Sequence, residues 1–128
     1  MNRRRRPDRG AAVVDFVLVG TLATLIFVGV VQLAVVLHVR NTLIDCASDG
    51  ARYGALADRV PADGASRAAA LITQDLSAGY ARDVTAGVEN VGGLPTVVVR
   101  VRAPLPVLGL LGVGRVVTVT GHALAEGP

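Results

Sequence analysis

The feature that most constrains this chain is an uncharged apolar run of twenty-two residues, Phe16 to Leu37, with the sequence FVLVGTLATLIFVGVVQLAVVL. A helix of this length spans roughly 33 Å, which matches the hydrocarbon core of a bilayer, about 30 Å thick. A helix also pairs its backbone N–H and C=O groups internally, as lipid requires. The alternative, a buried helix of a soluble core, would be shorter and would carry a polar face. We therefore predict one membrane-spanning helix over about residues 16–37.

The distribution of charge predicts the orientation of this span. Residues 1–15 hold five arginines and two aspartates, a net charge of +3, whereas residues 16–128 hold eight arginines and eight acids. Because short cytoplasmic segments beside a span are rich in Arg and Lys, we expect the N-terminus inside the cytoplasmic membrane and the C-terminal part outside. The alternative, a basic arm that binds nucleic acid, is disfavoured by the position of the charge, and we expect no nucleic-acid partner.

Composition argues against catalysis. The chain has no lysine, which excludes a P-loop ATPase and Schiff-base chemistry. His38 and His122 lie far apart and belong to no metal-binding spacing. Cys46 is the single cysteine, so it cannot form an intramolecular disulfide, and we expect it to be a packing residue. We expect a protein that is not an enzyme and that has no catalytic residue, metal or cofactor.

The junction ahead of the apolar run reads RGAAVVDF over residues 9–16. A secretory signal peptide is the alternative here, but its apolar core is shorter and ends at a small-x-small site. A basic leader that ends in Gly10, followed by an acid at Asp15, an aromatic at Phe16 and a long apolar helix, resembles the class III signal of type IV pilins and pseudopilins. In that family a prepilin peptidase cuts after the glycine, here between Gly10 and Ala11. The family's acid is usually Glu, and Asp15 keeps the carboxylate on a shorter side chain.

The resemblance implies a role for Asp15 in assembly. A carboxylate at the edge of the hydrocarbon is costly unless it is paired. The N-terminal amine of a neighbouring subunit, freed at Ala11 by cleavage, would be its partner and would set the stagger between packed helices. The alternative is that Asp15 is only a boundary residue in the first helical turn, favoured by the helix dipole.

Beyond the membrane, the same helix is predicted to continue to about Ala57. Small residues recur on one of its faces, including Ala47, Gly50 and Gly54. Such residues allow another backbone to come close. That backbone belongs either to the protein's own module or to another subunit, and we assign Gly50 and Gly54 to helix packing with both alternatives open. On another face, Asp49 is expected to pair weakly with Arg52.

Two further stretches make the resemblance more specific. They are LHVRNTL at residues 37–43 and ASDGARYGA at residues 47–55. Together with the junction at Gly10, they resemble TadE-like proteins over about residues 9–57. In that family a pilin-type helix is followed by a segment similar to A-x-E-G-A-R-x-A, and Asp49 stands where the family often has Glu.

The TadE-like resemblance implies a non-enzymatic minor pseudopilin that takes part in assembly of a Flp/Tad-type (type IVb) pilus or a related secretion fibre. The partners it implies are the membrane, a prepilin peptidase, the pilin, other minor pseudopilins and an inner-membrane assembly platform. The alternative is an uncleaved single-pass signal-anchor protein that displays a small cell-envelope binding module.

The remaining sequence predicts a small α+β module. Turn residues at 59–64 break the chain, and a second helix is expected from Ala65 to about Ala78, with Gly79 as its C-cap. Alternating patterns then predict three strands, at residues 85–91, 96–102 and 116–123. In the second of these, Val97, Val99 and Val101 share one face, whereas Val98 lies on the other face with Arg100 and Arg102. An irregular apolar link is expected at residues 104–114.

The predicted fold class is therefore α+β and membrane-anchored. A long N-terminal transmembrane, pilin-like helix is followed by a small module of one helix and about three antiparallel strands. The expected domains are a basic cytoplasmic leader at residues 1–10, a long helix at residues 11–57 and an extracytoplasmic module at residues 58–128.

Overall fold

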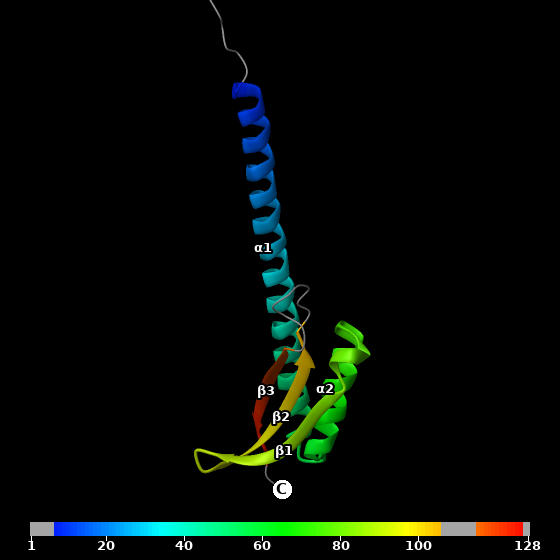
Figure 1. Cartoon of the computed structure of the whole chain (residues 1–128). Coiled ribbons are helices and arrows are strands. Elements are labelled where there is room, and N and C mark those ends of the chain that lie inside the picture. Colours follow the sequence, from blue (N-terminus) through cyan, green and yellow to red (C-terminus); the bar gives the residue numbers. More distant parts are fainter. Residues whose placement is uncertain (1–6, 106–114, 127–128) are drawn as a thin grey trace, which may run out of the picture. The chain divides into compact units, whose positions relative to one another are not determined.

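The structure, a computed structural model, describes residues 7–105 and 115–126. Its elements follow the order α1, α2, η1, β1, β2, β3 (Figure 1). The chain divides into two compact units, residues 1–34 and residues 35–128. A long apolar N-terminal helix, a second helix and a three-stranded antiparallel sheet are present, so the predicted α+β fold class is confirmed.

Helix α1 (Pro7–Gly54) contributes to both units. It begins four residues before the predicted Ala11 and ends three residues before the predicted Ala57. Proline is compatible with the first position of a helix. The N–H group at this position has no acceptor within the helix, so proline, which lacks the N–H, loses no hydrogen bond there.

In the first unit, the apolar side chains of α1 are exposed, and Phe16 is 79% exposed. The hydroxyl of Thr24 donates to the carbonyl of Gly20 at 2.8 Å, so this polar group is satisfied within the helix. By its length and composition, α1 can cross a membrane.

The second unit contains a sheet of three strands, β1 (Asp83–Val91), β2 (Leu94–Pro104) and β3 (Val116–Leu124), in the order β1-β2-β3. Both pairs are antiparallel. Gly92 and Gly93 form the two-residue turn between β1 and β2, with φ of 61° and 84°. These left-handed conformations favour glycine and are typical of tight hairpins. All three strands extend one to two residues beyond their predicted limits at one or both ends; residues 106–114 of the predicted link lie outside the described residues.

The two faces of the sheet differ as the sequence predicts, with two exceptions. Val97, Val99 and Val101 are buried on one face, whereas Arg100 is exposed on the opposite face, called the outer face below. The exceptions are Val98 and Thr96, which lie on the outer face but are only 2% and 5% exposed.

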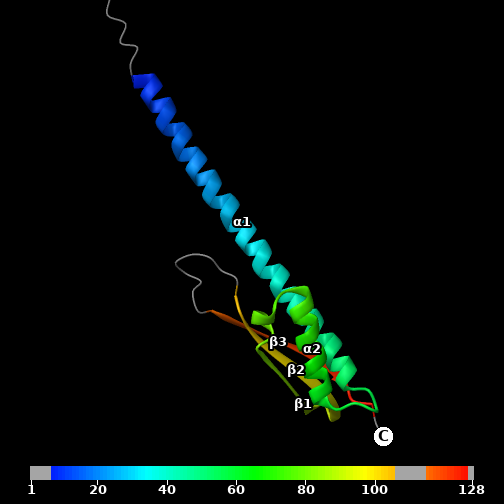
Figure 2. The ribbon, with the colours of Figure 1, turned by 90° about the vertical axis from the view of Figure 1, so that its right-hand side faces the viewer.

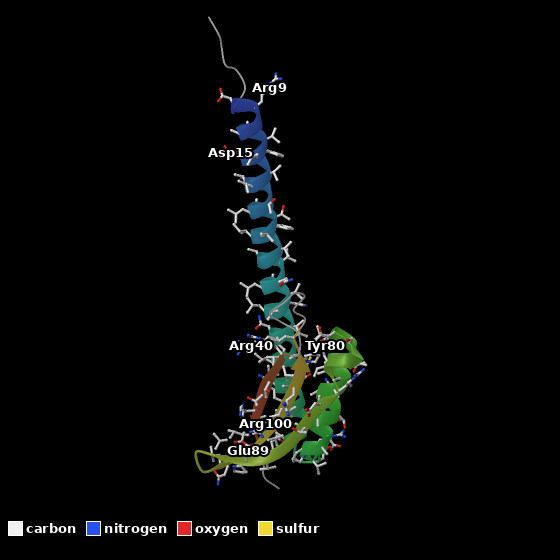
Figure 3. The ribbon with its side chains drawn as sticks, viewed as in Figure 1. Arg9, Asp15, Arg40, Tyr80, Glu89 and Arg100 are labelled. Carbon is white, nitrogen blue, oxygen red and sulfur yellow. The ribbon has the colours of Figure 1, made fainter. Side chains whose placement is uncertain are left out.

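An ion pair joins β1 and β2 on the outer face of the sheet. The guanidinium of Arg100 lies 2.8 Å from a carboxylate oxygen of Glu89 (Figure 3). By register, Glu89 is opposite Thr96 and Val98 is opposite Gly87. Glu89 and Arg100 therefore lie on either side of the Gly87–Val98 position on the outer face.

Helix α2 (Pro61–Asp75) starts and ends earlier than predicted. The break expected at residues 59–64 lies earlier, at residues 55–60, because Pro61 begins the helix and the carboxylate of Asp63 accepts a hydrogen bond from the N–H of Val60 at 3.0 Å. The expected C-cap is wrong, since Gly79 lies in the following 3-10 helix η1 (Ala78–Tyr80) and α2 is capped at Leu76.

One hydrophobic core holds the second unit together. Helix α2 and the C-terminal part of α1 lie side by side against the inner face of the sheet (Figure 2). The core residues come from α1, α2, β2 and β3: Val39, Leu43, Cys46, Ala47, Ala51, Ala68, Ile72, Val99, Val101, Ala103 and Val119.

Candidate assembly site

The residues predicted for processing and assembly lie near the start of α1. Gly10, Ala11, Asp15 and Phe16 are all exposed, and all are helical. Figure 3 shows the side chain of Asp15 at the helix surface. Ala11 and Asp15 are four residues apart, so they share one face of the helix.

A shallow open groove follows directly on the same helix. Its lining residues are Phe16, Val17, Gly20, Thr21, Thr24 and Leu25. A Cβ atom added at Gly20 would meet no other atom within 4 Å, so the glycine leaves a free depression on the surface of α1. Closely packed membrane helices use such depressions to bring their backbones together.

Gly50 and Gly54 are placed differently, because both are buried against α2. A Cβ atom at Gly50 would lie 2.5 Å from the carbonyl oxygen of Gly64, and one at Gly54 would lie 3.1 Å from the Cα of Gly64. The backbone that approaches these glycines is thus that of α2 in the same chain. A role for them between subunits stays a prediction.

Gly121 is a packing position that sequence reasoning missed. A Cβ atom there would overlap the backbone of Ala47 and Ser48, so the glycine lets β3 lie directly on α1. The available signal was an isolated glycine inside a strand pattern, which often marks a close backbone approach.

Polar side chains link the two helices at their surface. Asp49 of α1 lies 3.5 Å from the guanidinium of Arg67 in α2, so its ion-pair partner is Arg67 rather than the predicted Arg52. Arg67 and Arg59 lie 5.3 Å and 4.8 Å from the ring centre of Tyr53. At these distances the guanidinium groups are attracted to the face of the Tyr53 ring by cation–π interaction. Residues 47–54 of the TadE-resembling stretch therefore hold α1 to α2.

Cys46 lies in the core, only 3% exposed, as expected for a packing residue. Its Sγ lies 3.8 Å from a carboxylate oxygen of Asp75. Burial, reinforced by the negative charge of Asp75, raises the pKa of the thiol to about 11. A thiol in this state is a poor nucleophile at neutral pH.

Within residues 7–105 and 115–126, no group of three or more His, Cys, Asp or Glu side chains could hold a metal ion. The polar groups of the second unit are instead distributed as surface ion pairs and helix contacts.

A comparison with protein families bears on the first helix. Residues 10–52 match the family model described as TadE-like protein. The TadE-like resemblance is confirmed. The matched segment begins at Gly10, contains the whole apolar run and ends within the part of α1 that is buried against α2 and the sheet. No curated protein and no solved structure matched the chain.

Proposed function

We propose that this protein is a non-enzymatic minor pseudopilin that takes part in assembly of a Flp/Tad-type (type IVb) pilus or a related secretion fibre. The observation that carries the proposal is the TadE-like match, because it starts at Gly10 and includes the whole exposed apolar run. The family suggests involvement in Tad pilus assembly and association with a membrane. We also propose how the protein is processed, how it is oriented in the membrane and which partners it has.

The exposed apolar surface of α1 supports a membrane location. A continuous surface of this kind is unstable in water and is stable in the hydrocarbon region of a bilayer. The excess of arginine over residues 1–15 supports a cytoplasmic N-terminus. The protein would then cross the cytoplasmic membrane once, with the second unit outside.

Processing by a prepilin peptidase would fall between Gly10 and Ala11. Both residues are helical, so cleavage requires the first turns of α1 to unwind. Glycine lowers the free energy needed for unwinding, since it is about 1 kcal/mol less favourable in a helix than alanine. A Cβ atom at Gly10 would meet nothing within 4 Å, so packing within the chain does not require a glycine there.

After cleavage, Asp15 would pair with the N-terminal amine of a neighbouring subunit. The carboxylate is surrounded by exposed apolar residues, including Val14 and Phe16, and has a large desolvation cost to offset once these enter lipid. The groove over Gly20 would then receive an adjacent helix, either of the pilin or of another minor pseudopilin. The peptidase, these pilins and an inner-membrane platform are the partners that the family resemblance implies.

Substitution of Asp15 tests the proposal. We expect Asp15→Ala and Asp15→Lys to lower the amount of assembled fibre by about tenfold or more, as expected for loss of roughly 1.4 kcal/mol per contact. Asp15→Glu should assemble normally, because it keeps a carboxylate and introduces the Glu that the family usually has. Sheared fibre would be measured against the steady-state amount of the protein in membranes.

The matched control is Asp45→Ala, which removes an exposed carboxylate from α1 in the second unit. It should leave assembly unchanged. Full assembly with both Asp15→Ala and Asp15→Lys would show that the proposed pairing is wrong.

A further inference from the structure

Arginines from distant parts of the chain gather at one end of the second unit. Arg102 on β2 is opposite Asp83 on β1 and Thr118 on β3. Arg82 directly precedes Asp83, and Arg115 directly precedes β3. All three arginines are exposed.

The direction of β3 shows which end this is. Gly121 packs on Ala47, and the N–H of Glu126 donates to the carbonyl of Ala55 at 2.9 Å, so β3 and α1 run in the same direction. A strand rises about 3.3 Å per residue and a helix about 1.5 Å. Arg115 therefore lies level with the first turns of the second unit's part of α1, where the apolar run ends.

Arg40 completes the group from α1. It lies three residues after Leu37, the last residue of the apolar run, and it is exposed. Figure 3 places Arg40 and Tyr80 at one end of the second unit, away from Arg100 and Glu89. We call Arg40, Arg82, Arg102 and Arg115 the arginine cluster.

The arginine cluster separates charge along the second unit. It holds four arginines, one of which is opposite Asp83, whereas the other described residues from 35 to 126 hold four arginines and seven acids. The two ion pairs found between described residues use Arg67 and Arg100. Neither belongs to the cluster, so its guanidinium groups face solvent without a carboxylate partner among the described residues.

We propose that the arginine cluster binds the phosphates of anionic phospholipid headgroups on the outer surface of the membrane. This inference rests on the proposed function in one respect, that α1 spans a bilayer over about residues 16–37. The end of the span is then the level of the headgroups, and the four arginines surround it from α1, β2 and the segments before β1 and β3. Guanidinium groups bind phosphate oxygens through paired hydrogen bonds and are weakly hydrated. Anionic headgroups attract basic residues only within about a Debye length, roughly 10 Å.

Anionic lipid is favoured over an acidic protein because of where the cluster lies. A protein-binding patch would be expected on a side of the unit, whereas these arginines lie at the end from which the apolar helix continues. Contact with headgroups would also fix the second unit against the membrane before assembly, with the opposite end presented outward.

The experiment measures how close this end lies to lipid. The full chain carrying Thr118→Cys, labelled with a nitroxide, would be reconstituted in vesicles of phosphatidylcholine with or without phosphatidylglycerol. We expect the collision rate of the label with a water-soluble nickel chelate to fall by about twofold or more with phosphatidylglycerol, since each nearby basic residue favours contact with an anionic surface. High salt should reverse the effect. Cys46 stays in place, because it is buried, and unlabelled parent protein checks that it does not react.

Matched variants identify the arginines responsible. Arg40, Arg82, Arg102 and Arg115 changed together to Gln should abolish the lipid dependence at residue 118. The same change at Arg52, Arg59, Arg67 and Arg100 removes an equal charge from the rest of the second unit. It should preserve the lipid dependence at residue 118. A label at Asn90→Cys, near the turn between β1 and β2, should be insensitive to lipid. Circular dichroism would confirm that each variant folds.

Flotation of the vesicles separates the two proposals. Protein that floats with vesicles but shows equal accessibility at residue 118 in both lipids would overturn the headgroup contact and leave the membrane anchor intact. Protein that does not float with either vesicle would overturn both.

Discussion

At the scale of single residues, Gly121 is where one added methyl group should be most costly. Its α-hydrogen faces the backbone of Ala47 and Ser48, and backbone cannot move aside as a side chain can. We expect Gly121→Ala to lower the free energy of unfolding of the second unit by about 1–3 kcal/mol, the usual range for overpacking. Denaturant unfolding of the full chain in detergent, followed by circular dichroism, would measure it.

Gly87 provides the matched control for this substitution. It lies in β1 of the same sheet, and a Cβ atom there would meet nothing within 4 Å. Gly87→Ala should therefore change stability by less than about 0.5 kcal/mol. Equal effects of the two substitutions would contradict the close contact between β3 and α1.

Cys46 should react slowly while the protein is folded. Burial and the charge of Asp75 raise its pKa from 9.0 to about 11, so the thiolate fraction at pH 8 is about a hundredfold below that of an ordinary thiol. Alkylation by iodoacetamide, measured by mass, should be correspondingly slower in the folded than in the denatured protein. Asp75→Asn should speed it, whereas a folded rate equal to the denatured rate would contradict the burial.

The same pKa predicts how stability depends on pH. The folded protein holds the Cys46 proton more tightly than the unfolded chain does. The contribution of this thiol to stability is therefore complete below about pH 9 and is lost as pH rises towards about 11. Cys46→Ala should remove this part of the alkaline loss.

At the scale of elements, the crossing of α1 and α2 depends on Gly64. Glycine inside a helix is normally unfavourable, so Gly64→Ala would stabilise an isolated α2 by about 1 kcal/mol. In the folded unit, however, the added Cβ atom would lie 2.5 Å from the carbonyl oxygen of Gly50. We expect the net effect to be destabilising, as measured by denaturant unfolding.

Gly79→Ala is the control for Gly64→Ala, because the nearest atom to its added Cβ is the Ser77 hydroxyl at 3.7 Å, an ordinary contact. It should be close to neutral. Stabilisation by Gly64→Ala would mean that α1 and α2 are not in close contact.

The helices and strands were predictable where local pattern decides them. The apolar run and the alternation of Val97, Val99 and Val101 each follow from spacing, and both were predicted. The start of α2 was not, since Pro61 can either break a helix or begin one. The helix begins at Pro61, where the carboxylate of Asp63 accepts a hydrogen bond from the N–H of Val60, a start signal that the predicted break overlooked. The burial of Val98 on the outer face likewise does not follow from the alternation.

At the scale of the whole molecule, the TadE-like match joins two kinds of surface on one helix. Its first part contains the exposed apolar run, and its last part contains buried core residues such as Leu43 and Ala47. Much of the candidate site was therefore readable from the order of motifs, beginning with Gly10 and Asp15. The arginine cluster was not, because its members come from four separated segments that only the sheet and its register bring to one end.

The mass and N-terminal sequence of the protein purified from its native membrane would show whether the chain is cut after Gly10. The pseudopilin proposal predicts a chain that begins at Ala11 and has lost the arginine-rich leader, since cleavage is proposed between Gly10 and Ala11. A chain that still carries Arg3 to Arg6 would contradict it and would favour an uncleaved signal anchor that displays a cell-envelope module.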